Sequence, residues 1–437
     1  MYTDRRKFIA GTGAAFGGLL LGGCVSASAP LGVASASRFG ALQPDPAGVL
    51  DLPSGFSYRI LSRLGDALDD GGSVPDKADG MGCFDIGNGK LALVRNHELS
   101  PPDDGGGATG PAYDTVARSL IPLPGGTTTI VIDAATLAVE RQYRSLAGTI
   151  RNCAGGITPW NSWLTCEENT SRADGRINKD HGYVFEVPAD APGQMNPAPL
   201  KAMGRFVHEA ACVDPATGIV YMTEDRGDSL LYRFIPTRPG QLAHGGTLQA
   251  LVLDGVTDTS NHESIAMQAG QAVRGSWITL EDVESPEDDL RTRGAARGAA
   301  RFSRGEGIWM GDGEMFFTAT SGGAAREGQI FRLRPDAASG DMLDLFYESP
   351  AGSEYSFGDN ICVAPYGDLV VCEDQYGETV DNYLRGITPA GEAYPLGRLR
   401  LQTETAGACF SPDGRTMFLN IYHPTMTLAI TGPWPKI

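Results

Sequence analysis

The sequence of 437 residues lacks the local signatures of several common enzyme classes. It contains no Gly-x-Ser-x-Gly nucleophile motif, and no Walker loop or dinucleotide fingerprint stands out. The segment Asn261-His262-Glu263-Ser264 combines imidazole, carboxylate and hydroxyl groups but has no clear partner elsewhere. These absences disfavour serine hydrolases of the α/β type, P-loop enzymes and nicotinamide-dependent dehydrogenases.

Positive charge is also scarce. Thirty-five Lys and Arg residues stand against 53 Asp and Glu residues, which gives a net charge of -18. Because a nucleic-acid backbone requires a basic surface to neutralise it, nucleic acid is not an expected partner. The excess acid indicates either a soluble acidic surface or carboxylates that are neutralised by bound cations.

Long apolar runs are limited to the N-terminus. Arg5-Arg6 precedes the apolar stretch 10–23, which is shorter than the about 20 residues that span a bilayer. This order is typical of a twin-arginine export signal, and the following Leu21-Gly22-Gly23-Cys24 is similar to a lipoprotein cleavage box. We therefore expect a signal over 1–24, a flexible Ala/Ser/Gly/Pro-rich tether over 25–45 and one catalytic domain over 46–437. The export machinery is an expected partner, and the mature protein is expected to be periplasmic or exported. Cys24 is either acylated as a lipid anchor or removed by ordinary cleavage further along the chain.

Seven further cysteines contain no CxxC pair, and their odd number excludes a complete disulfide framework. A zinc ribbon or a thioredoxin-like motif is therefore not indicated. Most of these cysteines are expected to be small buried hydrophobic residues in strands. Cys153, which precedes Ala154-Gly155-Gly156 in a predicted turn, is the best candidate for a reactive or metal-binding thiol.

Helical periodicity is sparse, whereas short strand signals dominate from residue 55 onward. Units of roughly 40 to 70 residues, each with several strands, predict an all-β fold and specifically a β-propeller of six or seven blades. The segment 273–282 is either one of these units or an inserted hairpin. The acidic and then arginine-rich stretch 284–304 is expected to be an irregular loop over the active-site face. A closed propeller has few free edges, so a monomer is expected.

A turn followed by an apolar strand and then by acidic residues recurs along the chain. Calcium takes six to eight oxygen ligands, and strands that deliver carboxylates at one end of a propeller supply them. A single acidic pair is more often a solvated turn, so the prediction depends on recurrence at equivalent places. The candidates are Asn96-His97-Glu98, Glu167-Glu168-Asn169, His208-Glu209, Glu224-Asp225, Glu281-Asp282, Asp359-Asn360 and Glu373-Asp374.

Arg304-Gly305-Glu306-Gly307 places a guanidinium two residues from a carboxylate. A planar guanidinium fork matches phosphate oxygens, so Arg304 is a candidate for binding an anionic oxygen ligand. The alternative is a surface arginine in an arginine-rich loop.

Several of these segments together resemble the PhoX-type alkaline phosphatases, a bacterial family of exported β-propellers. The likeness covers most of residues 50–425, and it rests on the combination because each motif alone is weak. The matching segments are Arg95-Asn96-His97-Glu98, Asn152-Cys153-Ala154-Gly155-Gly156, Thr158-Pro159-Trp160, Leu164-Thr165-Cys166-Glu167-Glu168-Asn169, Gly204-Arg205-Phe206-Val207-His208-Glu209, Tyr221-Met222-Thr223-Glu224-Asp225, Leu231-Tyr232-Arg233-Phe234, Arg304-Gly305-Glu306-Gly307, Gly328-Gln329-Ile330-Phe331-Arg332 and Asp359-Asn360.

The resemblance implies a centre of ferric iron and calcium that hydrolyses phosphate esters. By motif, Cys153 would be an iron ligand and Glu306 an iron or calcium ligand, while Glu98, Glu168, Glu224 and Asp225 would be further ligands. Arg304 would bind phosphate, and Arg304 and Glu306 would be the catalytic pair. Asn360 would hold either phosphate or calcium. Which of Glu224 and Asp225 is the ligand remains open at this point.

We therefore expect a metal-dependent phosphatase that acts on small phosphate monoesters at a calcium/iron centre in the propeller channel. One alternative is a calcium-dependent lactonase-like or phytase-like propeller hydrolase, which needs carboxylates but no thiol ligand. Another is a non-catalytic metal-binding envelope lipoprotein.

Overall fold

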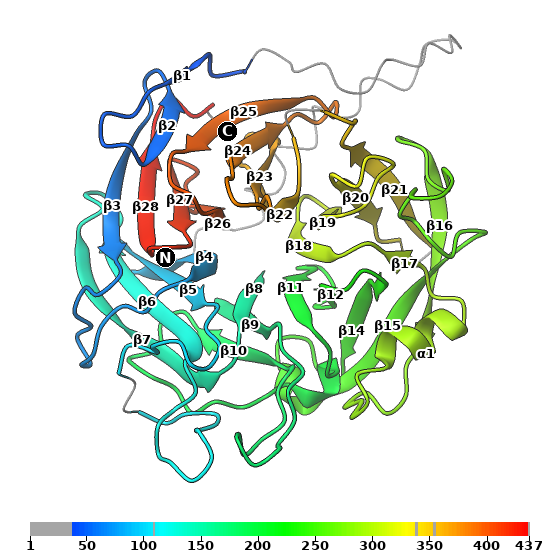
Figure 1. Ribbon diagram of the computed structural model, residues 1–437, viewed down its shortest axis with the longest axis horizontal. Coiled ribbons are helices and arrows are strands. Elements are labelled where there is room, and N and C mark those ends of the chain that lie inside the picture. Colours follow the sequence, from blue (N-terminus) through cyan, green and yellow to red (C-terminus); the bar gives the residue numbers. More distant parts are fainter. Residues whose placement is uncertain (1–36, 108–109, 337–339, 353–354, 436–437) are drawn as a thin grey trace.

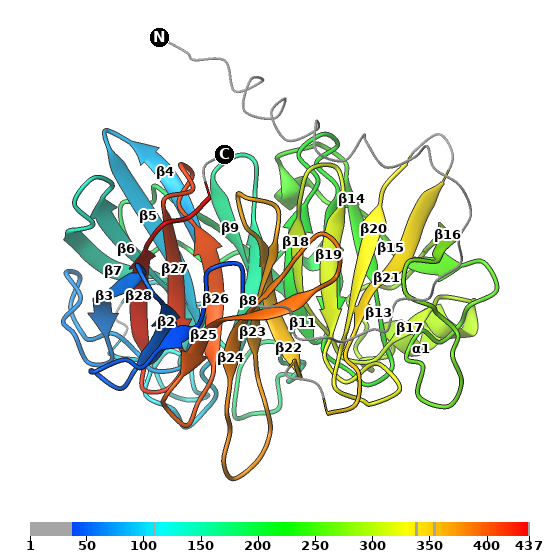
Figure 2. The same ribbon diagram turned by 90° about the horizontal axis from the view of Figure 1, so that it is seen from above.

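The structure, a computed structural model, describes residues 37–107, 110–336, 340–352 and 355–435. These residues form antiparallel sheets arranged like propeller blades around a central axis, which Figure 1 shows in one view and Figure 2 in a view turned by 90°. Within these ranges α1 (Leu290–Ala296) is the one α-helix, and 3-10 turns lie at Lys201–Met203 and Leu242–His244. The predicted all-β class and the propeller-like arrangement are therefore confirmed. The predicted signal, Cys24 and the first part of the tether lie outside the described residues.

The strands nearest the axis are end strands of their sheets, and each contacts the inner strands on either side, so that these strands close a ring around the axis. The ring consists of β4 (Ala78–Gly87), β8 (Asn152–Ile157), β11 (His208–Val213), β18 (Gly305–Met310), β22 (Gly358–Val363) and β26 (Thr405–Phe410).

Further strands extend each sheet outward by antiparallel pairing. They are β5 (Lys90–His97), β6 (Gly125–Asp133) and β7 (Val139–Thr149) beside β4; β9 (Ser162–Glu167) and β10 (Val184–Pro188) beside β8; β12 (Val220–Glu224), β14 (Tyr232–Pro236) and β15 (Gly246–Leu253) beside β11; β19 (Met315–Ala319), β20 (Gln329–Arg334) and β21 (Asp341–Glu348) beside β18; β23 (Leu369–Glu373), β24 (Tyr383–Ile387) and β25 (Ala393–Leu399) beside β22; and β27 (Thr416–Ile421) and β28 (Met426–Thr431) beside β26.

The two ends of the described chain are joined through shared sheets. β3 (Ser57–Arg63) pairs with β28, so an N-terminal strand completes the sheet that begins at β26. β2 (Leu50–Pro53) pairs with β25, and β1 (Leu42–Gln43) pairs with β2. This pairing covers edges that would otherwise be exposed and ties the N-terminal segment to the domain.

Part of the predicted tether is folded against the domain. Arg38 forms an ion pair of 2.9 Å with Asp368. The ring of Phe39 lies 5.2 Å from that of Phe56 and 5.7 Å from that of Trp434. The folded domain therefore begins by Arg38 rather than at residue 46, because composition alone did not reveal that this aromatic ring has a partner at the C-terminal end.

The core lies between neighbouring sheets, where each strand contributes alternate apolar side chains. All seven cysteines after Cys24 are buried and free of disulfides, and the prediction that most of them are buried is confirmed. Three of them, Cys212, Cys362 and Cys409, occupy equivalent positions in β11, β22 and β26 and pack as small hydrophobic residues. Cys153 lies in β8 rather than in a turn, and its surroundings are polar.

Two expectations about the middle of the chain require correction. The segment 273–282 contains β16 (Ala272–Thr279), which pairs with both β15 and β21 at the outer rim and contributes no inner strand. The stretch 284–304 is not only a loop, because it contains α1 and then β17 (Arg301–Phe302), which pairs with β13 (Ser229–Leu230). Glycine at Gly294 lets α1 approach Leu230 closely, since a Cβ there would lie 2.6 Å from the leucine side chain. Within the described ranges no helix is both long and apolar enough to cross a membrane.

Candidate metal centre

The inner strands share an irregularity at their starts. In each of them the pairing with the next strand changes register within the first few residues. Such a bulge interrupts the alternation of side chains and re-aims the residue that it contains. The second residue of each strand lies within this bulge or, in β26, at its edge, and in chain order these residues are Asp79, Cys153, Glu209, Glu306, Asp359 and Ala406.

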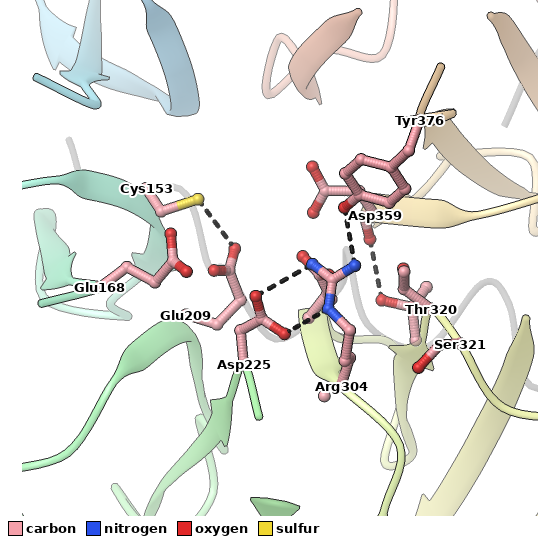
Figure 3. A network of polar contacts seen from close by, with 12 residues as sticks. Cys153, Glu168, Glu209, Asp225, Arg304, Thr320, Ser321, Asp359 and Tyr376 are labelled. Carbon is pink, nitrogen blue, oxygen red and sulfur yellow. Dashed lines mark hydrogen bonds and ion pairs between the residues drawn. The ribbon is translucent and has the colours of Figure 1, made fainter. Parts of the chain in front are cut away.

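Five of these residues therefore bring a metal-binding side chain to the axis. The thiol of Cys153 lies 3.2 Å from Glu209 Oε1 (Figure 3). It also lies 3.6 Å from Asp79 Oδ2. Single oxygen atoms of Glu209, Glu306 and Asp359 lie within 4.8 Å of one another.

The residue after each of these is small, apart from Asn360. Glycine is required where strands meet at the axis: a Cβ on Gly80 would lie 2.6 Å from Ala154 Cα, and one on Gly307 would lie 2.7 Å from the Asp359 carbonyl oxygen. These small residues line a narrow cavity of about 20 Å³ between the inner strands. The close approach of the strands thus brings the preceding carboxylates and the thiol together.

A second set of acids comes from the strands beside the inner ones. Glu98, Glu168, Asp225 and Asp374 each follow directly after the last residue of β5, β9, β12 and β23. The acids therefore recur at equivalent places, as the sequence predicted. Glu98 and Glu168 join Cys153 in a group whose ligand atoms lie within 4.8 Å of one another.

The last residue of three of these strands points the opposite way, as alternation requires. Glu167 contacts His181 at 2.6 Å, Glu224 accepts a hydrogen bond of 2.8 Å from the Tyr232 hydroxyl, and Glu373 accepts one of 2.8 Å from Arg385. These carboxylates hold sheets and loops together rather than facing the axis. Glu281 and Asp282, after β16, lie at the outer rim and belong to neither set.

The structure thus places Asp225 beside Arg304 in the cluster and Glu224 against Tyr232, away from it. We expect Asp225→Asn to reduce bound metal and turnover by at least about tenfold, because the carboxylate both adds charge to the cluster and orients Arg304. Glu224→Gln is the matched control, since it should lower thermal stability and leave metal content nearly unchanged. Elemental analysis of both purified variants checks this, and equal metal loss in the two would contradict the assignment.

Two arginines lie among the acids. The Arg151 guanidinium lies 2.8 Å from Glu98 Oε1 and 2.8 Å from Glu168 Oε2. Arg304 contacts Asp225 at 2.7 and 3.0 Å and Glu306 at 2.6 Å (Figure 3). Both arginines directly precede an inner strand and have positive φ, 50° and 59° respectively. This backbone turn, rare outside glycine, places each guanidinium over the cluster.

Asn360, predicted to bind phosphate or calcium, already has protein partners at both ends of its amide. It donates a hydrogen bond of 3.0 Å to Asp359 and accepts one of 2.6 Å from the Gly407 N–H. The structure therefore places Asn360 as a support for Asp359 along the cavity wall.

The cluster carries more negative charge than its arginines balance. Burial, and then the neighbouring carboxylates, raise the pKa values of the Asp79, Glu209 and Glu306 carboxyls and of the Cys153 thiol. Burial likewise raises the pKa of Asp359 to about 7. Within the cluster, the buried carboxylate oxygens Asp79 Oδ1, Glu209 Oε2 and Glu306 Oε1 have no hydrogen-bond partner among the described residues, and of these only Glu306 Oε1 is ion-paired, with Arg304.

These observations fit bound cations. Burying an ionised carboxylate without a partner costs free energy, and a bound cation would supply the missing positive charge. The oxygen atoms suit calcium, and the single thiolate among them suits a transition metal such as iron.

The search for acidic strand ends missed several residues of this site. Asp79, Glu404, Arg151 and Tyr376 were not among the predicted residues, although the Glu404 carboxyl interacts with Asp374 and the Tyr376 hydroxyl accepts a hydrogen bond from Arg304. Asp79 had a detectable signal: a ligand-type residue followed by a small one recurs at the start of every inner strand except β22, where Asn360 follows Asp359, and β26, which has Ala406 at this position. The arginines and Glu404 directly precede inner strands, and Tyr376 had no comparable signal.

Comparisons with known proteins agree with this geometry. The family model described as alkaline phosphatase PhoX matches residues 37–136 and 125–425. The chain also superposes on the structure of Pseudomonas fluorescens PhoX in complex with vanadate, a transition state analogue. The TM-score is 0.68 at 21% identity, and the match covers 88% of this chain and 96% of that one.

Two more distant structures share less. A Xanthomonas campestris gluconolactonase gives a TM-score of 0.43 at 14% identity, covering 90% of this chain and 98% of that one. A luciferin-regenerating enzyme gives 0.46 at 8% identity, covering 87% and 97%. No curated protein matches the chain. Because the family model covers most of the sequence, the chain belongs to the alkaline phosphatase PhoX family of phosphoric monoester hydrolases.

Proposed function

We propose that the protein is a metal-dependent phosphatase that hydrolyses small phosphate monoesters at a calcium/iron centre at the axis of the propeller. The observation that carries this proposal is the convergence of buried carboxylates and one thiol from five inner strands, with two oxygen atoms left unpartnered. Membership of the phosphatase family supports the reaction class. We also infer six blades, because each inner strand named above starts its own set of paired strands.

The donor set divides by chemistry. Cys153, with Glu98 and Glu168 nearby, would hold iron, because thiolate is the softest donor in the cluster. Glu209, Glu306 and Asp359 would hold calcium or share a ligand position with iron. When bound, such cations polarise a phosphoryl group and stabilise charge on its oxygens.

The protein's own groups orient the substrate. The Arg304 side chain is 26% exposed, so it reaches from the buried acids toward the mouth of the site. Its contacts with Asp225 and Glu306 hold the guanidinium in place before any anion arrives. A fixed cation of this kind binds and orients a phosphate group without reorganisation during the reaction. Glu306 therefore acts both as a ligand and as a support for Arg304.

The test is elemental analysis of protein exported by a twin-arginine-competent host, together with hydrolysis of an aryl phosphate ester with and without calcium chelator. Iron and calcium with chelator-sensitive phosphate release are the expected result. Calcium without iron, combined with lactone hydrolysis, would favour the lactonase-like alternative. Bound metal without turnover on either substrate would favour the structural envelope protein.

We further propose that the N-terminal segment directs export and that Cys24 is acylated. The support is the sequence alone, namely Arg5-Arg6, the apolar stretch and Leu21-Gly22-Gly23-Cys24. Arg5→Lys with Arg6→Lys should leave folded protein in the cytoplasm, and Cys24→Ala should release the exported protein from the membrane fraction. Size-exclusion chromatography of the released protein is expected to show a monomer.

A further inference from the structure

Arg304 cannot offer its guanidinium fork to a phosphate group without breaking its present contacts. A guanidinium has five N–H groups. The Nε and Nη2 side faces Asp225, with a second contact from Nη2 to Glu306, and Nη1 donates one hydrogen bond to Tyr376. Three of the five N–H groups donate hydrogen bonds, and the ion pair with Glu306 lies on the Nη2 side, so one N–H on Nη1 is left for an anion. A second donor beside Nη1 would therefore be needed for a two-point contact.

Tyr376 is placed to be that donor. Its hydroxyl oxygen accepts the Nη1 hydrogen bond at 2.7 Å, which leaves its own proton free to be donated (Figure 3). The Arg304 guanidinium carbon lies 5.2 Å from the centre of the tyrosine ring. Tyr376 is 57% exposed, so its hydroxyl stands between the buried cluster and solvent. The Asp374 carboxyl also interacts with this hydroxyl and is the competing acceptor for its proton.

The loop that carries Tyr376 is fixed rather than loosely attached. Gln375 donates hydrogen bonds to Ser356 Oγ and, from its backbone, to the Asn382 side chain, each of 2.9 Å. Phe357 packs edge-on against the Tyr376 ring at 5.7 Å and has a φ of 52°. Phe357 directly precedes β22, just as Arg151 and Arg304 directly precede their inner strands, and all three residues have positive φ. At β22 the residue in this conformation packs against Tyr376, whereas at the other two strands it supplies a guanidinium.

We propose that the Tyr376 hydroxyl and Arg304 Nη1 together bind one oxygen of the substrate's phosphate group, which makes Tyr376 a substrate-binding residue. This inference rests on the proposed phosphatase function. The hydroxyl would turn its proton from Asp374 to the anion, while Asp225 and Glu306 keep the guanidinium in position.

The test compares the metal-loaded wild-type protein with Tyr376→Phe, which keeps the ring over Arg304 and removes the hydroxyl. Calorimetric titration with inorganic phosphate is expected to show about tenfold weaker binding, equal to about 1.4 kcal/mol. For an aryl phosphate, KM should rise by a similar factor while kcat changes less than twofold. Tyr383→Phe is the matched control, because its ring lies against Arg385 and Arg398 rather than Arg304.

The outcomes separate this inference from the proposed function. If the wild-type protein binds no phosphate and releases none from esters, the proposed function fails. If the wild type does both and Tyr376→Phe binds phosphate equally well, only the role of Tyr376 is overturned. Loss of bound metal in Tyr376→Phe would overturn it too, since the hydroxyl would then support the metal centre and not the substrate.

Discussion

Cys153→Ser is expected to leave less than about one tenth of the wild-type iron and to lower phosphate-ester turnover by at least about a hundredfold. Removing even an outer partner of a metal ligand costs about 10–100-fold in metal affinity or activity, and Cys153 is proposed as a ligand itself. Serine keeps the size of the side chain but replaces a soft thiolate with a hydroxyl that is a poor iron ligand. Iron and calcium content by elemental analysis, measured with turnover on the same preparation, checks the prediction.

Cys212→Ala provides the control for this experiment. Cys212 lies in β11, three residues after Glu209, and packs in the core between sheets. Its replacement should cost some thermal stability while iron content and turnover stay near wild-type values. A Cys153→Ser protein that keeps its iron and turns over normally would show that the thiol is structural.

The architecture was accessible from the sequence because a propeller repeats. Short apolar strands separated by glycine and proline turns recur along the chain, and repeats of this length with little helical periodicity are typical of a propeller. The pairing of β3 with β28 and the packing of Phe39 could not be predicted in the same way. Both join residues that are several hundred positions apart, and no local pattern records which distant partner a strand or ring will meet.

At some strand ends the sequence identified an acidic pair but not which of its two residues faces the axis. In a strand a shift of one position turns a side chain to the opposite face, so Glu224 and Asp225 are indistinguishable by composition yet have opposite roles. Bulges at the starts of the inner strands add a second uncertainty, because they break the alternation that would otherwise place Asp79 and Glu306. Asn360 shows a third uncertainty, because hydrogen bonds with Asp359 and Gly407 occupy both ends of its amide and no sequence pattern predicts these partners.

Metal-free protein is expected to lose stability as the pH rises from about 5 to 8, and calcium is expected to restore it. The Asp359 carboxyl has a pKa raised from 3.8 to about 7 by burial and by Asp374, so the folded state binds more protons than the unfolded state between these values. The free energy of unfolding therefore falls as the pH rises through this window. For Asp359 the difference corresponds to on the order of 4 kcal/mol. Asp79, Glu209 and Glu306 act in the same direction.

Calcium should reverse this slope because it binds the ionised carboxylates of the folded state. At a free concentration of about 100 times Kd it would add about 2.7 kcal/mol, and this gain should grow as the carboxyls deprotonate. Thermal unfolding of chelator-treated protein at pH 5 and pH 8, with and without calcium, measures both effects. The double variant Asp79→Asn/Glu209→Gln removes two of the buried charges at nearly constant volume. It should be more stable than the wild type in the metal-free state at pH 8 and should gain little from calcium.

If the metal-free wild type is instead more stable at pH 8 than at pH 5, the buried acids are already neutralised within the protein, and the case for a cation centre loses its electrostatic basis.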